Sequence, residues 1–221
     1  MSIDHTAAPA AHSGPVVELS GLTKVYGTAE TQVTALDHIT VAFERGRFSA
    51  IMGASGSGKS TLMHCLAGLD SITSGSAMIG DVEINKLGDK ALTRLRREAV
   101  GFIFQSFNLI PTLTALENIM LGAEPQRAGW LRRSAATQRA RLALEQLGHG
   151  HLELEKPAGS LPVAEQQIVE IARALRTEPR VLIMDEPTSS LAQSDVERLF
   201  AVIRQLRERG VSVIYISHFL E

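Results

Sequence analysis

Apolar positions along the chain alternate between short continuous runs and helical spacing. The runs predict strands at 16–19, 33–36, 39–43, 49–52, 76–86, 100–104, 181–184 and 211–216. Apolar residues three and four positions apart predict helices after residue 61 and over 92–98, 114–121, 134–147, 168–175 and 194–209. The run at 181–184 has no polar member, which is typical of a strand covered on both faces. Strands that alternate with helices favour an α/β fold with a mostly parallel sheet.

Local signals mark the ends of some of these elements. Ser194 followed by Glu197 predicts a capping box at the start of the last helix. Gly148 stands where a helix C-terminal glycine is expected. Residues 122–130 combine glycines and a proline and form the most linker-like break. Residues 1–15 are rich in Ala, Pro, Ser and His, and we expect them to form a disordered tail before one domain at 16–221.

Composition indicates a globular chain with a sizeable core. The 221 residues are 44% hydrophobic, and the formal net charge is −2, with a mean hydropathy of +0.06. This charge balance gives no overall attraction to nucleic acid or anionic lipid. No apolar run approaches the roughly 18 residues of a membrane span. The single cysteine, Cys65, excludes an internal disulfide and fits a reducing compartment.

One glycine-rich segment between a predicted strand and a predicted helix carries the clearest chemistry. It consists of Gly53, Ala54, Ser55, Gly56, Ser57, Gly58, Lys59, Ser60 and Thr61. Glycines allow a turn that points successive N–H groups at a polyanion. Lys59 adds a charge on the outer phosphates, and Ser60 offers a hydroxyl to Mg²⁺. A Gly/Ser linker is the bland alternative, but a linker does not require the flanking strand and helix.

Two adjacent carboxylates end the apolar strand at 181–184. In an open α/β sheet, ligands bind at the carboxyl ends of strands. We expect Asp185 to hold Mg²⁺ through water. Glu186 is predicted to point the other way along the strand and to polarise the attacking water. A pair of idle surface acids is common elsewhere, but it is a weak explanation beside a phosphate-binding loop.

Together these motifs resemble the nucleotide-binding domain of ABC transporters, from about residue 16 to the C-terminus. Residues 53–61 match its Walker A loop, 181–185 its Walker B strand, and 189–192 its D-loop. The resemblance implies that Tyr26 stacks on adenine and that Gln105 reaches Mg²⁺ and the attacking water. It also implies that Glu186 is the catalytic glutamate and that His218 lies near the γ-phosphate.

The same resemblance implies an architecture and a function. The fold is that of a P-loop NTPase, with an N-terminal antiparallel β subdomain and an inserted helical subdomain at about 106–165. The function is that of an ATP-hydrolysing subunit, an ATPase that uses ATP and Mg²⁺. Its implied partners are a second nucleotide-binding domain in a head-to-tail dimer and a separate transmembrane permease, with no nucleic acid. Its implied location is cytoplasmic, peripheral on the cytoplasmic face of the cell membrane.

The signature motif departs from the family pattern Leu-Ser-Gly-Gly-Gln. The matching residues are Leu161, Pro162, Val163, Ala164 and Glu165. In the family this segment caps the γ-phosphate of the opposite subunit's ATP with a serine hydroxyl and N–H groups. Pro162 supplies neither, and the D-loop has Ala192 in place of its usual aspartate. The alternative function is therefore a nucleotide-binding module with impaired hydrolysis.

The two halves of the chain resemble different branches of the family. Residues 20–121 are similar to ATPases of macrolide export and lipoprotein release, and residues 122–221 to sugar-import ATPases of the ribose and galactose type. We hypothesise a mosaic of two cassettes, a natural or engineered chimera. The family also continues past the switch histidine, so we expect this chain to lack the family's C-terminal end.

Two other nucleotide-dependent classes fit less well. A GTPase of the same superfamily needs an Asn-Lys-x-Asp guanine reader, and the segment at 85–88 has glycine in place of the aspartate. DNA-repair and ribosome-associated ABC proteins usually carry two cassettes in one chain, and only one is visible here.

Overall fold

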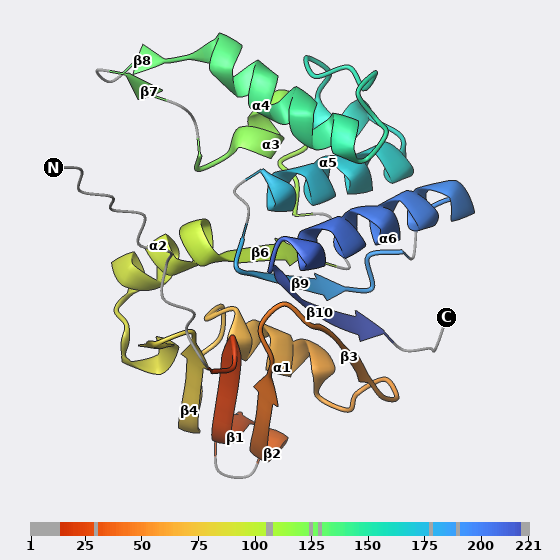
Figure 1. Ribbon diagram of the computed structural model, residues 1–221. Helices are drawn as coiled ribbons and strands as arrows, with labels where there is room; N and C mark the ends of the chain where they lie inside the picture. Colours follow the sequence, from red (N-terminus) through yellow and green to blue (C-terminus); the bar gives the residue numbers. More distant parts are fainter. Residues whose placement is uncertain are drawn as a thin grey trace, which may run out of the picture.

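Two β-sheets and a group of helices make up the molecule, which is a computed structural model (Figure 1). The structure describes residues 14–28, 31–104, 108–123, 126–127, 130–176, 179–188 and 191–217. The tail predicted at 1–15 falls outside these residues except for its last two positions. Within the described part of the chain, none of the helices combines the length and the apolar character that crossing a membrane requires.

The N-terminal sheet is antiparallel and has the strand order β2-β1-β4-β5. Its strands are β1 (Val17–Tyr26), β2 (Val33–Phe43), β4 (Ser74–Ile79) and β5 (Val82–Glu83). The sequence predicts two strands at 33–36 and 39–43, but the structure has one continuous strand, so this prediction was wrong in detail. The interruption in the sequence pattern corresponds to a local irregularity within this strand. His38 has φ 49, and the pairing with β1 shifts register between Ile39 and Leu36.

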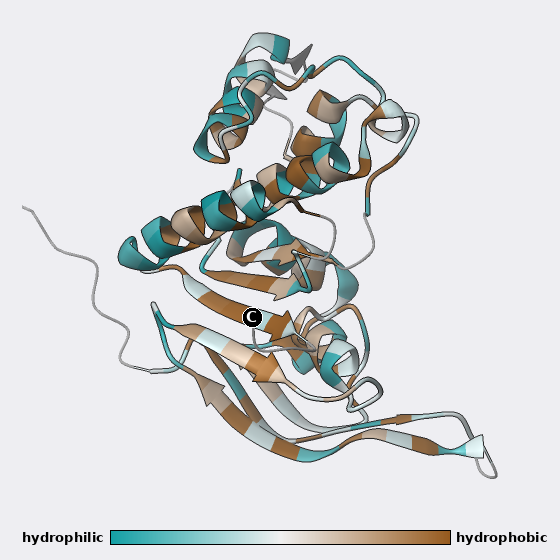
Figure 2. Ribbon diagram, turned by 90° about the vertical axis from the view of Figure 1, so that its right-hand side faces the viewer, coloured by the Kyte–Doolittle hydropathy of each residue, from teal (hydrophilic) through white to brown (hydrophobic). Residues whose placement is uncertain are grey.

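The second sheet is parallel, as the sequence predicts, with the order β3-β10-β9-β6. Its strands are β3 (Phe48–Met52), β6 (Val100–Ile103), β9 (Val181–Asp185) and β10 (Ser212–Ser217). All five residues of β9 are buried, which confirms that both of its faces are covered. Leu182 and Met184 face one hydrophobic core, and Val181 and Ile183 face the other. These apolar strands cross the middle of the molecule in Figure 2.

Helices cover the two faces of this sheet and fill the remainder of the molecule. They are α1 (Lys59–Leu66), α2 (Asp89–Ala99), α3 (Ala115–Met120), α4 (Arg133–Gln146), α5 (Val163–Leu175) and α6 (Gln193–Glu208), with short 3₁₀ turns η2 (Ile84–Lys86) and η3 (Ala158–Ser160) and a hairpin of β7 (Gln126–Arg127) and β8 (Trp130–Leu131). Helix α1 packs between the two sheets. Helices α3, α4 and α5 pack on one another. Helices α3 and α4 lie within residues 106–165, where the sequence predicts a helical subdomain, whereas most of α5 lies beyond this range.

Two of the predicted helix ends have different outcomes. Gly148 follows α4 with φ 75 and donates its N–H to the Glu145 carbonyl, which confirms the predicted glycine stop. The predicted capping box at the last helix is wrong. Helix α6 has Ala192 at its N-cap, and no side chain of the described residues caps it. Ser194 lies inside the first turn, so its hydroxyl is too late in the chain to cap the helix.

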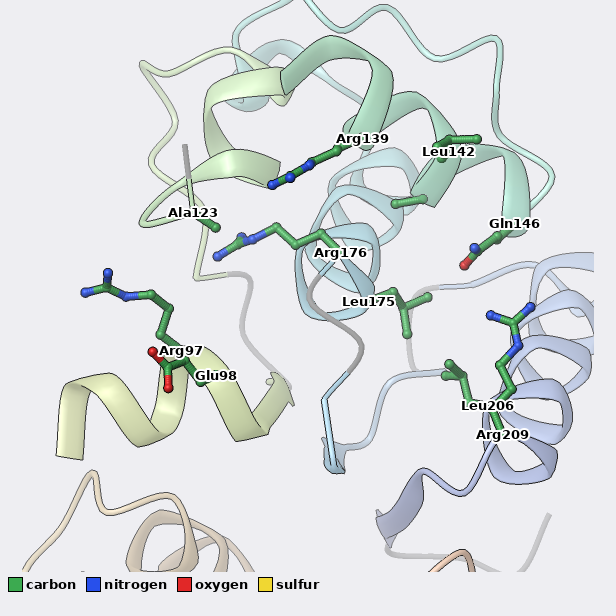
Figure 3. A pocket seen from close by; sticks show the side chains of 11 residues that line it. Arg97, Glu98, Ala123, Arg139, Leu142, Gln146, Leu175, Arg176, Leu206 and Arg209 are labelled. Atoms are coloured by element: carbon green, nitrogen blue, oxygen red, sulfur yellow. The ribbon is translucent and has the colours of Figure 1, made fainter. Parts of the chain in front are cut away.

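Arginines gather where several of these helices end. A surface cleft of about 620 Å³ lies between α2, α4, α5 and α6 (Figure 3). Arg97 is in the last turn of α2, and Arg176 and Arg209 are the C-cap residues of α5 and α6. Arg176 donates to the carbonyls of Ile119 and, at 2.8 Å, Leu121, and so ties α5 to the end of α3. Cations stabilise helix C-termini, which explains this cluster without a ligand.

Candidate functional site

The glycine-rich loop lies between β3 and α1, as the sequence predicts. Gly56 and Gly58 have φ 77 and φ 89, a left-handed conformation that side chains disfavour. A Cβ at Gly58 would lie 2.6 Å from the Ala35 carbonyl oxygen, and one at Gly53 would lie 2.8 Å from the Ser57 Oγ. The loop therefore keeps its shape because glycines let it lie directly against β2 and fold tightly on itself.

Lys59 directly follows this loop, and its side chain turns back to the loop carbonyls. It is the first residue of α1 and is only 7% exposed. Its Nζ donates to the carbonyl oxygens of Gly53 at 2.7 Å and Ala54 at 2.8 Å, and lies 3.4 Å from the Ser57 Oγ. These contacts hold the ammonium in place from within the loop, so its charge is already positioned for an anion.

The N-terminus of α1 supplies the second favourable term for an anion. No side chain among the described residues caps it, and its first turn has no acidic residue. The N–H groups of a first helical turn have no partners within the helix, and the helix dipole is positive there. A glycine cradle, a fixed ammonium and an uncapped helix start fit the phosphates of a nucleotide.

A cleft of about 670 Å³ opens beside this loop. Among its lining residues are Ser60, Asp185, Phe104 and Asn108, so the structure brings two of the three residues predicted to hold magnesium to one space. Asp185 ends β9 and is 6% exposed. Among the described residues, no group of three His, Cys, Asp or Glu side chains could hold a metal ion. Mg²⁺ is commonly held by one or two carboxylates together with substrate phosphates, and this sparse oxygen set fits that pattern.

Glu186 lies directly after β9 in an unusual backbone conformation. Its φ is 47, whereas β9 ends at Asp185. Its N–H donates to the Ile216 carbonyl of β10 at 3.0 Å. The alternation predicted along the strand therefore does not extend to Glu186, because a left-handed turn sets the direction of its side chain. Such strain in a non-glycine residue is found most often at functional sites.

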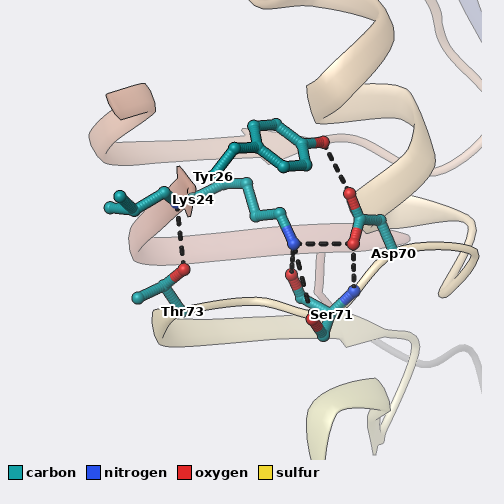
Figure 4. Close-up of polar contacts among 6 residues, drawn as sticks. Lys24, Tyr26, Asp70, Ser71 and Thr73 are labelled. Carbon is teal, nitrogen blue, oxygen red and sulfur yellow. Dashed lines mark hydrogen bonds and ion pairs between the residues drawn. The ribbon is translucent and has the colours of Figure 1, made fainter. Parts of the chain in front are cut away.

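Tyr26 is the last residue of β1 and belongs to a polar network that the sequence did not reveal (Figure 4). Its hydroxyl donates to Asp70 Oδ2 at 2.5 Å, and its pKa is raised mainly by this bond. The Lys24 Nζ lies 2.6 Å from Asp70 Oδ1 and 4.7 Å from the Tyr26 ring centroid.

This network fixes the ring and connects it to the cleft. Burial raises the pKa of Asp70, but hydrogen bonds from Lys24 and Tyr26 outweigh burial, so the net pKa is lowered. Asp70 also lines the 670 Å³ cleft. Tyr26 as a whole residue is 40% exposed, so its hydroxyl is held while surface remains for a planar ligand. Lys24 and Asp70 are far apart in sequence, and no local motif marks them.

The segment at the signature position forms the start of α5. Pro162 is the N-cap residue, and no described side chain caps this helix. Leu161 is buried and its carbonyl accepts from Gln166 Nε2 at 2.9 Å. Val163 is 53% exposed, and Ala164 and Glu165 follow in the first turn.

The remaining predicted site residues fall outside the described part of the chain. They are Gln105, His218, and the D-loop serines Ser189 and Ser190.

Comparison with known proteins identifies the family. The "ABC transporter" family matches residues 36–189. The chain is 40% identical over 204 residues to a lipoprotein-releasing system ATP-binding protein, LolD, of Geobacter metallireducens, covering 92% of this chain and 89% of LolD. It is 39% identical over 209 residues to a ribose import ATP-binding protein, RbsA, of Chromobacterium violaceum, covering 93% of this chain but only 39% of RbsA. Both alignments run across residues 122–130, so the mosaic hypothesis stays a prediction.

Solved structures give the same answer for the fold. The ATP-binding cassette MJ0796, in a dimeric post-hydrolysis state bound to ADP and Pi, has a TM-score of 0.84 and 36% identity, covering 92% of this chain and 88% of the cassette. A nucleotide-free ATP-binding cassette from an ABC transporter has a TM-score of 0.75 and 25% identity, covering 92% of this chain and 81% of that one. The loop, the cleft and these similarities lead to one conclusion: the chain belongs to the ABC transporter family and is an ATP-binding domain of the P-loop NTPase fold.

Proposed function

We propose that this chain binds Mg-ATP in the cleft between the glycine-rich loop and β9, hydrolyses it, and acts as the motor subunit of a transporter. The observation that carries the proposal is the placement of Lys59 within the loop, beside a cleft shared by Ser60 and Asp185. The ATPase activity is proposed because the site contains groups that can bind phosphates, hold a metal and orient water.

Each group has a separate role in the proposed reaction. The loop amides and Lys59 bind the β- and γ-phosphates. Ser60 and Asp185 would hold Mg²⁺, which neutralises phosphate charge when it is bound. Glu186 orients the attacking water and accepts its proton. Tyr26 provides a stacking surface for adenine.

Residues outside the described part of the chain complete the proposal. Gln105 would contribute to the metal and water, and His218 would steady the γ-phosphate as charge develops. The resemblance to the family supports both roles.

Partners are proposed from the same similarities. The MJ0796 cassette is dimeric in its post-hydrolysis state, which supports a head-to-tail pair of cassettes that encloses two ATP molecules. A separate transmembrane permease would dock near residues 106–125, at the cytoplasmic face of the membrane. The relatives' names differ in cargo, from ribose to lipoproteins and macrolides. The proposal therefore rests on the step that they share, which is the use of ATP.

Replacement of Lys59 by Ala tests nucleotide binding. We expect Lys59→Ala to raise the Kd of the fluorescent nucleotide mant-ATP, measured with Mg²⁺, by about tenfold or more, because a charge-assisted contact is worth about 1.5–3 kcal/mol. Lys90→Ala, on the exposed surface of α2, is the matched control and should leave the Kd unchanged. Absence of mant-ATP binding by the unmodified chain, or equal Kd values for both variants, would contradict the proposal.

The signature segment allows a second test, of turnover in the dimer. Pro162 has no N–H and no hydroxyl, and it occupies the N-cap of α5. We expect the combined change Pro162→Ser, Val163→Gly and Ala164→Gly to raise the ATPase rate by about tenfold, because it restores donors for the opposite subunit's γ-phosphate. An unchanged rate would show that the signature does not limit turnover.

A further inference from the structure

Helix α5 carries polar side chains on the face that it buries. Gln167 is 2% exposed and Glu170 is 0% exposed. Arg173, one turn after Glu170, is mostly buried as well, with 16% of its side chain exposed. Burying an amide or a charge is unfavourable unless its atoms are hydrogen-bonded. The hydrogen-bond partners of these three side chains therefore indicate which part of the molecule this face of α5 holds in place.

All three side chains bind the main chain just beyond the ends of two parallel strands. Glu170 Oε1 accepts from the Phe104 N–H at 3.3 Å, after β6. Arg173 Nη1 donates to the Asn108 carbonyl at 2.6 Å, and its Nη2 lies 3.6 Å from Glu170 Oε1. Gln167 Nε2 donates to the Pro187 carbonyl, after β9. Figure 1 shows α5 above β6 and β9.

Two of these three positions border the proposed nucleotide cleft. Phe104 and Asn108 line it together with Ser60 and Asp185. Glu170 and Arg173 thus hold two residues of the same cleft lining that contains the proposed metal residues. The helix that holds them begins at Val163, the signature position.

The arrangement is costly for a contact that only stabilises the fold. Glu170 Oε2 and Gln167 Oε1 are buried without a hydrogen-bond partner among the described residues. An apolar side chain of similar volume is often neutral or stabilising at such a place. The main-chain contacts of Glu170 with Phe104 and Asn108 are the part of this arrangement that a positioning role explains.

We propose that Glu170 and Arg173 form a clamp that positions residues 104 and 108 against α5 and so sets the metal-side wall of the cleft. Glu170 is a positioning residue, since it contacts the wall and not the nucleotide. The clamp also links the position of α5, whose start faces the opposite subunit in the proposed dimer, to the chain's own nucleotide site. The inference rests on the proposed function, because it assumes Mg-nucleotide in this cleft.

The test compares mant-ATP binding with MgCl₂ and with EDTA. Glu170→Ala is expected to raise the Kd measured with Mg²⁺ by about tenfold, the equivalent of losing one hydrogen bond to a charged group. The Kd measured with EDTA should stay within about twofold, because the loop amides and Lys59 are not displaced. Glu170→Gln keeps an oxygen acceptor for Phe104 and should stay within about threefold of the unmodified chain. Glu208→Ala, an exposed carboxylate at the end of α6, is the matched control.

A second variant covers the case in which Glu170→Ala does not fold. Arg173→Leu removes the contact with Asn108 from the other half of the clamp and should also weaken only the binding measured with Mg²⁺. The clamp would be overturned if the variants weakened mant-ATP binding equally with and without Mg²⁺. It would also be overturned if neither Glu170→Ala nor Arg173→Leu weakened the binding measured with Mg²⁺. Binding that is absent in the unmodified chain would overturn the clamp and the proposed function together. Binding that is sensitive to Lys59→Ala but insensitive to both clamp variants would overturn the clamp alone.

Discussion

ATP turnover is expected to fall by about 10²- to 10⁴-fold when Glu186 is replaced by Gln, the usual contribution of a positioned general base. The amide keeps the shape of the side chain and removes its ability to accept a proton. Glu186 sits in a left-handed turn fixed by its N–H bond to Ile216, so the substitution should not move the main chain. The affinity for mant-ATP should therefore stay within about threefold, which separates chemistry from binding.

Steady-state phosphate release at saturating Mg-ATP measures this effect. Glu197→Gln, on the exposed face of α6, is the matched control and should retain full turnover. If the unmodified chain and Glu186→Gln are equally inert while both bind mant-ATP, the motor function is excluded, and the chain is a nucleotide-binding module. A full rate in Glu186→Gln would instead assign the general base to another residue.

The free energy of unfolding is expected to contain a contribution from Glu170 that falls by about 3 kcal/mol as the pH rises from about 4.5 to about 7. Burial raises the pKa of Glu170 from 4.5 to about 7, against the charge of Arg173 and the backbone hydrogen bonds from Phe104 and Asn108. Between these two values the folded chain retains a proton that the unfolded chain has lost. The stabilisation by Glu170 is therefore fully present below the unfolded pKa of 4.5 and is lost as the pH rises through the folded pKa of about 7.

Urea unfolding of the unmodified chain and of Glu170→Gln, at pH values from 4 to 8, isolates this contribution. The two should have similar stability at pH 4, where the carboxyl is neutral. Glu170→Gln should be more stable by about 3 kcal/mol at pH 8, where the unmodified chain buries a charge. The difference between the two unfolding free energies at each pH cancels the contributions of the other carboxylates. One of these is Asp70, whose lowered pKa gives the opposite pH dependence. A stability difference that does not change with pH would contradict a raised pKa at Glu170.

The parts of the molecule that the sequence predicts well are those where local chemistry decides the structure. The strand β9 is recognisable because both of its faces are buried, which leaves no polar position in its sequence before Asp185. The glycine-rich loop is recognisable because its conformation requires particular residue types at particular spacings. Each of the two signals is contained in a stretch of about ten consecutive residues or fewer, so periodicity and composition are enough to find it.

The features that the sequence does not predict depend on contacts between distant segments. Strand β1 pairs with β4, about fifty residues further along the chain, and no periodicity within either strand specifies that partner. The contact of Tyr26 and Lys24 with Asp70 has the same origin. Glu170 looks like an ordinary solvated helix position in the sequence, because only the tertiary structure reveals that α5 turns this residue inward.

The close approach of Gly58 to the Ala35 carbonyl means that the phosphate-binding loop takes its shape partly from a strand more than twenty residues earlier. We therefore expect nucleotide affinity to depend on the N-terminal sheet as well as on the loop's own residues. A substitution that destabilises β2 would weaken ATP binding even if every residue of the loop were unchanged.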